Sequence, residues 1–133
     1  MSLDVAPSLI EQAERGQVDE SVFVETVERS LPYAWSIMSG VAGELAGGFT
    51  NREGFADHAS PPPSEAERGQ LLRALASDAI RGALERHFGV RFAFQNCHRV
   101  AAFRPADVGG DSYREFVSIR SQILNQSPAL RDC

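Results

Sequence analysis

The chain has 133 residues, a formal net charge of −5 at neutral pH, and 43% hydrophobic and 23% charged residues. These values predict one ordinary globular domain over residues 1–133, with no apolar stretch long enough to span a membrane and no secretion signal. All 13 basic residues are arginine, which excludes lysine Schiff bases, a phosphate-loop lysine and a lysine general base.

The first third of the chain predicts three helices. Ser8 and Glu11 have the spacing of a capping box, and Gly16 follows as a helix end. Asp19 is a typical N-cap for a second helix. Pro32 suits the first turn of a third helix, which ends at the glycine pair 47–48.

Residues 47–63 form the one long irregular stretch and end in three prolines, which fix an extended backbone. The stretch has few apolar residues that could anchor it in a core, mainly Phe49 and Phe55. We therefore expect the loop at about 47–63 to be the most mobile internal segment, with Arg52 open to proteolysis.

The clearest helix signal lies at residues 64–88. Ser64 and Glu67 form a capping box, and apolar residues follow at helical spacing until Gly89. The apolar direction changes by roughly 110° along this stretch. The pattern favours one central helix with a possible kink, and the alternative is a break near Ser77 and Asp78.

Two strands and a last helix complete the predicted fold. Residues 90–94 and 99–103 are rich in Phe and Val on either side of a short polar turn, which indicates a β-hairpin. A helix capped by Asp111 or Ser112 follows, and residues 125–133 form a flexible tail. The fold class is α+β, mostly helical, with about five helices and one small hairpin.

Charge is unevenly distributed along the chain. Residues 1–64 carry a net charge of −7, residues 65–104 carry +3, and residues 105–133 carry −1. Either the acidic and basic segments face one another within the fold, or the arginines bind an anionic ligand or partner. The overall acidity argues against nucleic acid as a ligand.

The hairpin turn holds the candidate site. Cys97 and His98 are the candidates for a catalytic thiol and base, and Asn96 with nearby arginines would add polarity. Adjacent strand residues point to opposite faces, which argues against a Cys97–His98 pair. The candidate ligand-binding residues are Arg91, Asn96, Arg99 and Arg104.

No metal or cofactor is expected. The soft ligands lack any paired spacing such as C-x-x-C. They are Cys97, Cys133, His58, His87 and His98. Two cysteines so far apart are not a secreted disulfide framework, so we expect free thiols and a cytoplasmic protein.

Several segments carry a family resemblance. Residues 71–78, 86–91, 95–99 and 125–133 resemble a family of small conserved hypothetical proteins of Streptomyces and related actinobacteria, over essentially the whole chain. The resemblance implies a bacterial cytoplasmic protein and transfers no catalytic residue to this chain.

The sequence therefore favours a noncatalytic protein that acts by binding, through self-association or a protein partner. Apolar helix surface at residues 64–88 and at Gly40 and Gly43 would hold a homodimer. The alternative is a small enzyme or anionic-ligand binder with a pocket around Asn96, Cys97, His98 and nearby arginines.

Overall fold

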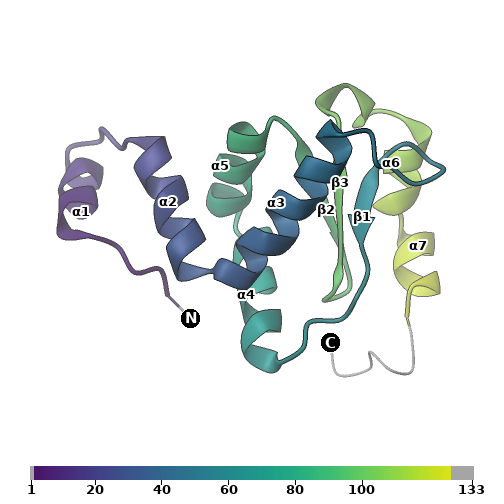
Figure 1. Cartoon of the computed structure of the whole chain (residues 1–133), viewed down its shortest axis with the longest axis horizontal. Coiled ribbons are helices and arrows are strands. Elements are labelled where there is room, and N and C mark those ends of the chain that lie inside the picture. The colour runs from purple at the N-terminus through teal and green to yellow at the C-terminus, as the bar shows by residue number, and fades with distance from the viewer. Residues whose placement is uncertain (1, 127–133) are drawn as a thin grey trace.

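The computed structural model describes residues 2–126, in which seven α-helices surround a small sheet of three strands (Figure 1). The elements in chain order are α1 (Pro7–Glu14), α2 (Glu20–Ser30), α3 (Pro32–Ala46), β1 (Ala56–His58), α4 (Glu65–Leu75), α5 (Asp78–Phe88), β2 (Arg91–Gln95), β3 (Arg99–Phe103), the 3-10 turn η1 (Pro105–Asp107), α6 (Asp111–Phe116) and α7 (Ile119–Leu124). The α+β, mostly helical class is confirmed.

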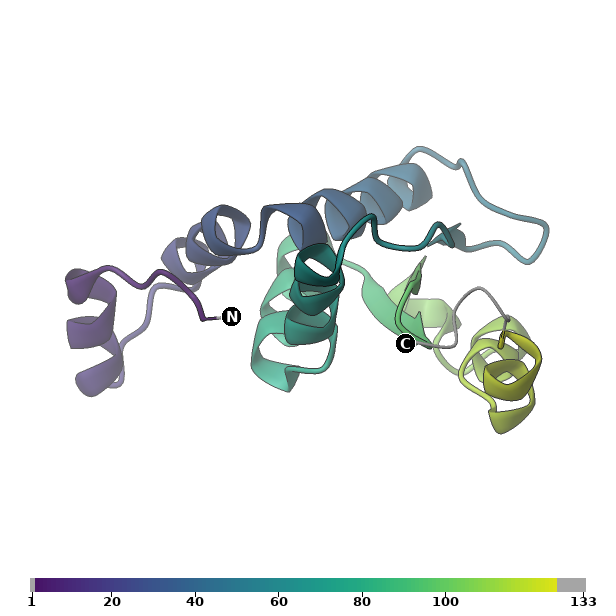
Figure 2. The ribbon, with the colours of Figure 1, turned by 90° about the horizontal axis from the view of Figure 1, so that it is seen from below.

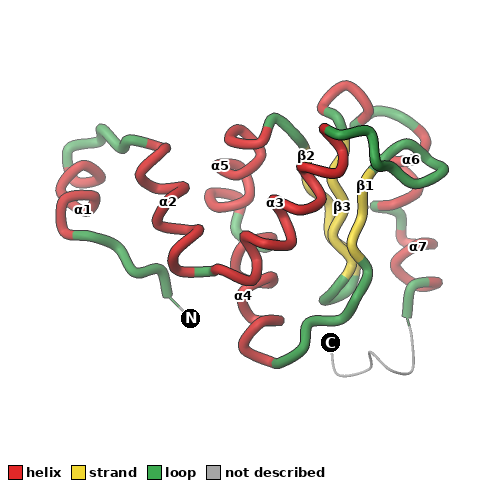
Figure 3. The backbone as a smooth tube through the Cα atoms, in the orientation of Figure 1, coloured by secondary structure: helices red, strands yellow, loops and turns green. Residues whose placement is uncertain are grey.

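The strands form one antiparallel sheet in the order β1-β3-β2 (Figure 3). β2 and β3 make the predicted hairpin, with Ala93 opposite Ala101. β1 pairs with the other edge of β3, with Asp57 opposite Ala101. The third strand was not predicted, and it makes β3 the central strand.

Side chains of β3 alternate between two separate cores. Val100 and Ala102 join the larger cluster, which α2, α3, α4 and α5 complete. Ala101 and Phe103 join a smaller cluster with Phe116 of α6. The sheet is therefore covered on both faces, and every residue of β3 from Val100 to Phe103 is buried.

The molecule is elongated, with α1 and α2 at one end and α6 and α7 at the other (Figures 1 and 2). In α1 only Leu9 is buried. Residues before α1 are tied to α2, because the Asp4 amide donates to the Ser30 hydroxyl at 2.9 Å and Arg29 donates to the Asp4 carbonyl at 2.7 Å. The first helix therefore lies beside α2, and Leu9 is the residue that it buries.

Several helix ends follow the predicted capping residues. Asp19 caps α2 and Ser64 caps α4 with their side chains. Pro32 opens α3, and Gly89 closes α5 in the left-handed conformation, at φ 69°. The predicted Ser8 cap of α1 is wrong, because that helix starts at Pro7 after Ala6. Helix ends of this kind depend on local sequence, so they can be found without the fold.

The predicted helix over 64–88 is two helices. The chain leaves α4 at Ala76, and Ser77 starts α5 by accepting a hydrogen bond from the Ile80 amide at 3.2 Å. The favoured continuous helix is therefore wrong, and the break near Ser77 is correct. The predicted last helix is likewise divided, at Val117 and Ser118. These divisions give seven α-helices within residues 2–126.

The predicted loop over 47–63 contains part of the core. Phe55 is buried and stacks on Phe103 at 4.5 Å between ring centroids, and the next three residues form β1. Phe49, the other predicted anchor, is exposed. The middle of the segment is anchored, while its mobility relative to other segments stays a prediction.

Candidate functional site

The hairpin separates the predicted ligand-binding arginines. Its register pairs Arg91 with Phe103 at one end and Gln95 with Arg99 at the other. Arg104 directly follows Phe103, so it lies at the same end of the hairpin as Arg91. Arg99 lies at the opposite end, beside the turn that contains Asn96. The structure brings Arg99, Asn96, Cys97 and His98 together, and it keeps Arg91 and Arg104 apart from them.

Arg91 and Arg104 are exposed and have acidic partners. The Arg91 Nε lies 3.5 Å from a carboxylate oxygen of Glu85. The Arg104 guanidinium lies 3.9 Å from the Asp107 carboxylate, one turn further along the chain. Neither arginine offers an unpaired charge to an anionic ligand.

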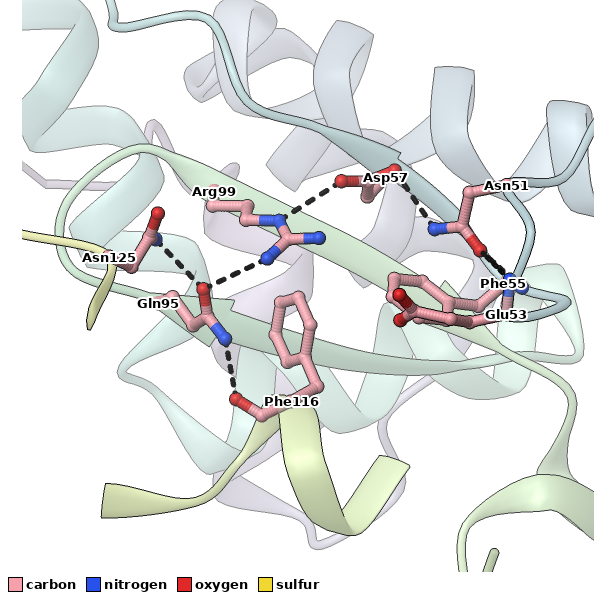
Figure 4. Close-up of polar contacts among 8 residues, drawn as sticks. All are labelled: Asn51, Glu53, Phe55, Asp57, Gln95, Arg99, Phe116 and Asn125. Atoms are coloured by element: carbon pink, nitrogen blue, oxygen red, sulfur yellow. Dashed lines mark hydrogen bonds and ion pairs between the residues drawn. The ribbon is translucent and has the colours of Figure 1, made fainter. Parts of the chain in front are cut away.

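Arg99 lies at the centre of a polar network between the strands and the C-terminal helices (Figure 4). Its Nε donates to the Asp57 carboxylate at 3.0 Å, and another of its nitrogens donates to the Gln95 side-chain oxygen at 3.3 Å. The guanidinium lies 4.9 Å from the centre of the Phe116 ring, within cation–π range. Arg99 thereby links β1, β2 and α6.

Amide side chains complete the network (Figure 4). Asn51 donates to Asp57 at 3.2 Å, and its oxygen accepts from the Glu53 and Phe55 amides. The side chain of the buried Gln95 donates to the Phe116 backbone carbonyl at 2.6 Å. Its oxygen accepts from the side-chain amide of Asn125 at 2.8 Å. Each of these groups already has a partner within the chain, so the network holds elements together.

Asn96 ties the hairpin turn to the end of α7. Its φ of 54° is left-handed, a conformation that asparagine tolerates better than most residues. Its side chain donates to the Asn125 carbonyl at 2.7 Å and accepts from the side chains of Gln122 and Gln126. These bonds leave Asn96 a turn residue that anchors α7.

Cys97 and His98 are both buried, at 4% exposure. Cys97 is disulfide-bonded, so the expected free thiol is wrong here and Cys97 is no nucleophile in this form. The chain's other cysteine, Cys133, lies outside the described residues. His98 Nδ1 has no hydrogen-bond partner within residues 2–126. Burial lowers the pKa of His98, with smaller contributions from the charges of Arg99 and His58.

An apolar groove lies at the other end of the molecule, between α1, α2 and α5. It encloses about 700 Å³. Sequence reasoning did not find it, because α1 and α5 meet only in the fold. Its apolar lining consists of Val5, Leu9, Ile10, Ala13, Val18, Phe23, Ala79 and Ala83.

Three charged side chains border this groove. Arg86 of α5 donates from Nε to both carboxylate oxygens of Glu20 at 3.0 Å, and this pair joins α5 to α2 beside the groove. The Arg86 side chain lowers the pKa of Glu20. Glu14, also at the border, has no ion-pair partner among the described residues. The groove thus combines an apolar floor with one uncompensated carboxylate.

Between residues 2 and 126, no group of three or more His, Cys, Asp or Glu side chains is arranged to hold a metal ion. The helices in that same range are all too short or too polar to cross a bilayer.

The fold and its surface define a small α+β protein with a structural polar network and an apolar groove. The chain belongs to the family described as "NucS shadow ORF", whose model matches residues 1–133. No curated protein and no solved structure matches the chain.

Proposed function

We propose that the protein acts by binding rather than by catalysis, and that its partner is a second copy of the same chain. The apolar groove between α1, α2 and α5 carries this proposal. Ile10 and Val18 line it and remain about half exposed in the single chain. Burying such surface against a partner is favourable, and binding sites are commonly lined in this way.

The alternative of an enzyme or anionic-ligand site at the hairpin turn has less support. Within residues 2–126 the arginine beside the turn is Arg99, and it already donates hydrogen bonds to Asp57 and Gln95. The Cys97 sulfur is in a disulfide. The orphaned His98 Nδ1 is the one feature that favours this alternative.

Sedimentation velocity at micromolar concentration tests self-association. We expect a dimer in both 0.1 M and 1 M salt, because apolar burial is not screened and exposed ion pairs are. Ile10→Glu should weaken the dimer, whereas Leu72→Glu, at an exposed apolar position outside the groove, should not. A monomer mass at both salt concentrations would overturn the proposal.

We further propose a cytoplasmic location in an actinobacterium. The support is the spacing of the two cysteines and the sequence resemblance. The disulfide at Cys97 counts against it. Quantitative thiol labelling of protein trapped with alkylating agent in intact cells decides the matter. Two free thiols support the cytoplasmic location, and none overturns it.

The family description leaves nucleic-acid binding open, since it refers to NucS. We keep nucleic acid outside the proposal because the net charge is −5 and the described arginines in the basic middle segment mostly have acidic partners. Gel shifts with single- and double-stranded DNA at low salt should therefore show no complex.

A shadow open reading frame is one that overlaps the coding sequence of another gene, so the proposal also requires that this frame is translated. Tryptic peptides of residues 16–29 and 53–68 are suitable markers for mass spectrometry of cell extracts. The control strain carries a stop codon in this frame that is synonymous in the NucS frame. Absence of both peptides from cells that make NucS would overturn a cellular function.

A further inference from the structure

The C-terminal helix exposes an apolar face that lacks a partner within the described chain. Ile119 is 80% exposed, Ile123 64% and Leu124 65%. Ile119 and Ile123 are four residues apart, so they lie on the same side of α7. Large apolar side chains this exposed on adjacent positions are typical of a contact surface.

The same helix is held in a fixed position by its polar side chains. The Gln122 side chain donates a hydrogen bond to the side-chain oxygen of Asn96. The side-chain nitrogen of Asn96 in turn donates to the backbone oxygen of Asn125, just after α7. Ser118 caps the start of the helix by accepting from the Ser121 amide at 3.1 Å. A contact face on such an anchored helix loses little conformational freedom on binding.

We infer that α7 of one copy occupies the apolar groove between α1, α2 and α5 of a second copy. This inference rests on the proposed self-association. The groove and α7 lie at opposite ends of the elongated molecule (Figure 1), so a chain does not fill its own groove with its own α7. The groove has a volume of about 700 Å³ and a mostly apolar lining, and α7 presents three large apolar side chains.

Charge supports the same pairing. Arg120 lies between the apolar positions of α7 and is 70% exposed, in a surface pair with Glu115. Glu14 borders the groove without an ion-pair partner in residues 2–126. An exposed pair such as Arg120–Glu115 contributes little, so Arg120 can turn to Glu14 of the second copy at small cost.

The contact must be made twice. A stable dimer buries about 800 Å² on each partner, more than a helix of six residues can cover. Two copies related by a two-fold axis, with their long axes antiparallel, bring each α7 to the other copy's groove and double the contact. The inferred assembly is therefore a closed, reciprocal dimer.

Complementation between two variants tests this arrangement in the full chain. Ile10→Glu blocks the groove and Ile123→Glu blocks α7, and both side chains are exposed enough for the fold to survive, which circular dichroism checks. Each variant alone should sediment as a monomer at a concentration where the wild-type chain is a dimer. Their equimolar mixture should associate more strongly than either variant alone but more weakly than the wild-type chain, because one of the two contacts, an intact α7 in an intact groove, is restored.

The other outcomes separate the two proposals. A monomeric wild-type chain overturns self-association itself. A wild-type dimer that survives Ile123→Glu leaves self-association standing and overturns the role of α7. A mixture that associates no more strongly than either variant alone, or wild-type species larger than a dimer, overturns the reciprocal arrangement. Leu72→Glu is the matched control and should remain a dimer.

Discussion

Gln70 supplies a cap that the start of α3 lacks. Leu31 precedes this helix and has no side-chain oxygen, and the first turn needs acceptors for its free amides. The Gln70 side chain of α4 accepts from the Tyr33 amide at 2.7 Å and from the Ala34 amide at 3.3 Å. One amide side chain therefore both caps α3 and ties it to α4.

Replacing Gln70 with alanine should show how much this cap contributes to stability. We expect Gln70→Ala to lower the free energy of unfolding by about 1–2 kcal/mol, the usual cost of losing an N-cap or a partly buried hydrogen bond. Guanidinium unfolding followed by circular dichroism measures it. Gln17→Ala, at an exposed position before α2, is the control and should cost much less.

His98 makes the stability of the protein depend on pH. Burial first, then the charges of Arg99 and His58, lower the pKa of His98 in the folded chain. In the unfolded chain the imidazole takes up its proton near pH 6.5. The unfolded state thus binds more protons below that pH, so the free energy of unfolding should fall as the pH drops from about 7 toward 5.

The variant His98→Gln removes this titration while keeping a polar side chain of similar size. Its unfolding free energy should change less between pH 7 and pH 5 than that of the wild-type chain. The comparison concerns the slope, so a general loss of stability does not affect it. Gln17→Ala, which changes an exposed side chain that carries no titratable group, should keep the wild-type slope. Equal slopes for wild type and His98→Gln would contradict the prediction.

At the scale of elements, Ser77 decides that residues 65–88 are two helices. Its hydroxyl accepts from the Ile80 amide, and the Arg81 guanidinium donates to the Leu75 carbonyl at 2.7 Å, at the end of α4. Both ends of the break are thus hydrogen-bonded. The change of apolar direction in the sequence has its origin here, because each helix packs with its own orientation.

We expect Ser77→Ala to lower the free energy of unfolding by about 1 kcal/mol, since alanine is among the poorest N-caps. Thermal and guanidinium unfolding should agree on the sign. Ser60→Ala provides the comparison, because Ser60 is exposed in the loop before α4 and forms no side-chain hydrogen bond within residues 2–126. If Ser77→Ala unfolds with the same free energy as the wild-type chain, tertiary packing alone keeps α4 and α5 separate.

Local signals account for the elements that the sequence predicted well. Asp19, Pro32 and Ser64 set helix starts through their own side chains or ring, and the Phe and Val content of the hairpin favours strands. β1 has no such signal. Ala56, Asp57 and His58 are too few to alternate, and only pairing with β3 makes them a strand.

The same limit applies to the candidate site. The sequence singled out Arg99 and Asn96, and the structure gives both of them partners. The sequence alone could not show that Arg99 pairs with Asp57, 42 residues earlier, because that pairing depends on the register of β1 against β3. The groove was equally out of reach, because it needs the relative placement of α1, α2 and α5.

At the scale of the whole molecule, the acidic and basic segments meet inside one chain. Glu20 pairs with Arg86, and Asp57 pairs with Arg99. The first of the two explanations for the charge pattern is therefore supported by these pairs. Between them they connect α2 to α5 and β1 to β3.

The partly buried pair should matter more than an exposed one on the same hairpin. The side chains of Arg99 and Asp57 are 27% and 22% exposed, whereas Arg91 is 52% exposed beside Glu85. We expect Arg99→Met to cost roughly 2 kcal/mol, below the cost of breaking a fully buried pair, and Arg91→Met to cost about 1 kcal/mol or less. Denaturant unfolding of both variants checks the order, and equal losses would contradict it.

The central place of β3 has a consequence for how the chain folds during synthesis. β3 begins at Arg99, yet it contributes side chains to both hydrophobic clusters and takes part in both strand pairings. When only the first 98 residues have emerged from the ribosome, the helices lack Val100 and Ala102 of the sheet, and β1 has no strand to join. Folding is therefore delayed until the last quarter of the chain emerges, and nascent chains that stall before Arg99 should be the targets of chaperones and proteases.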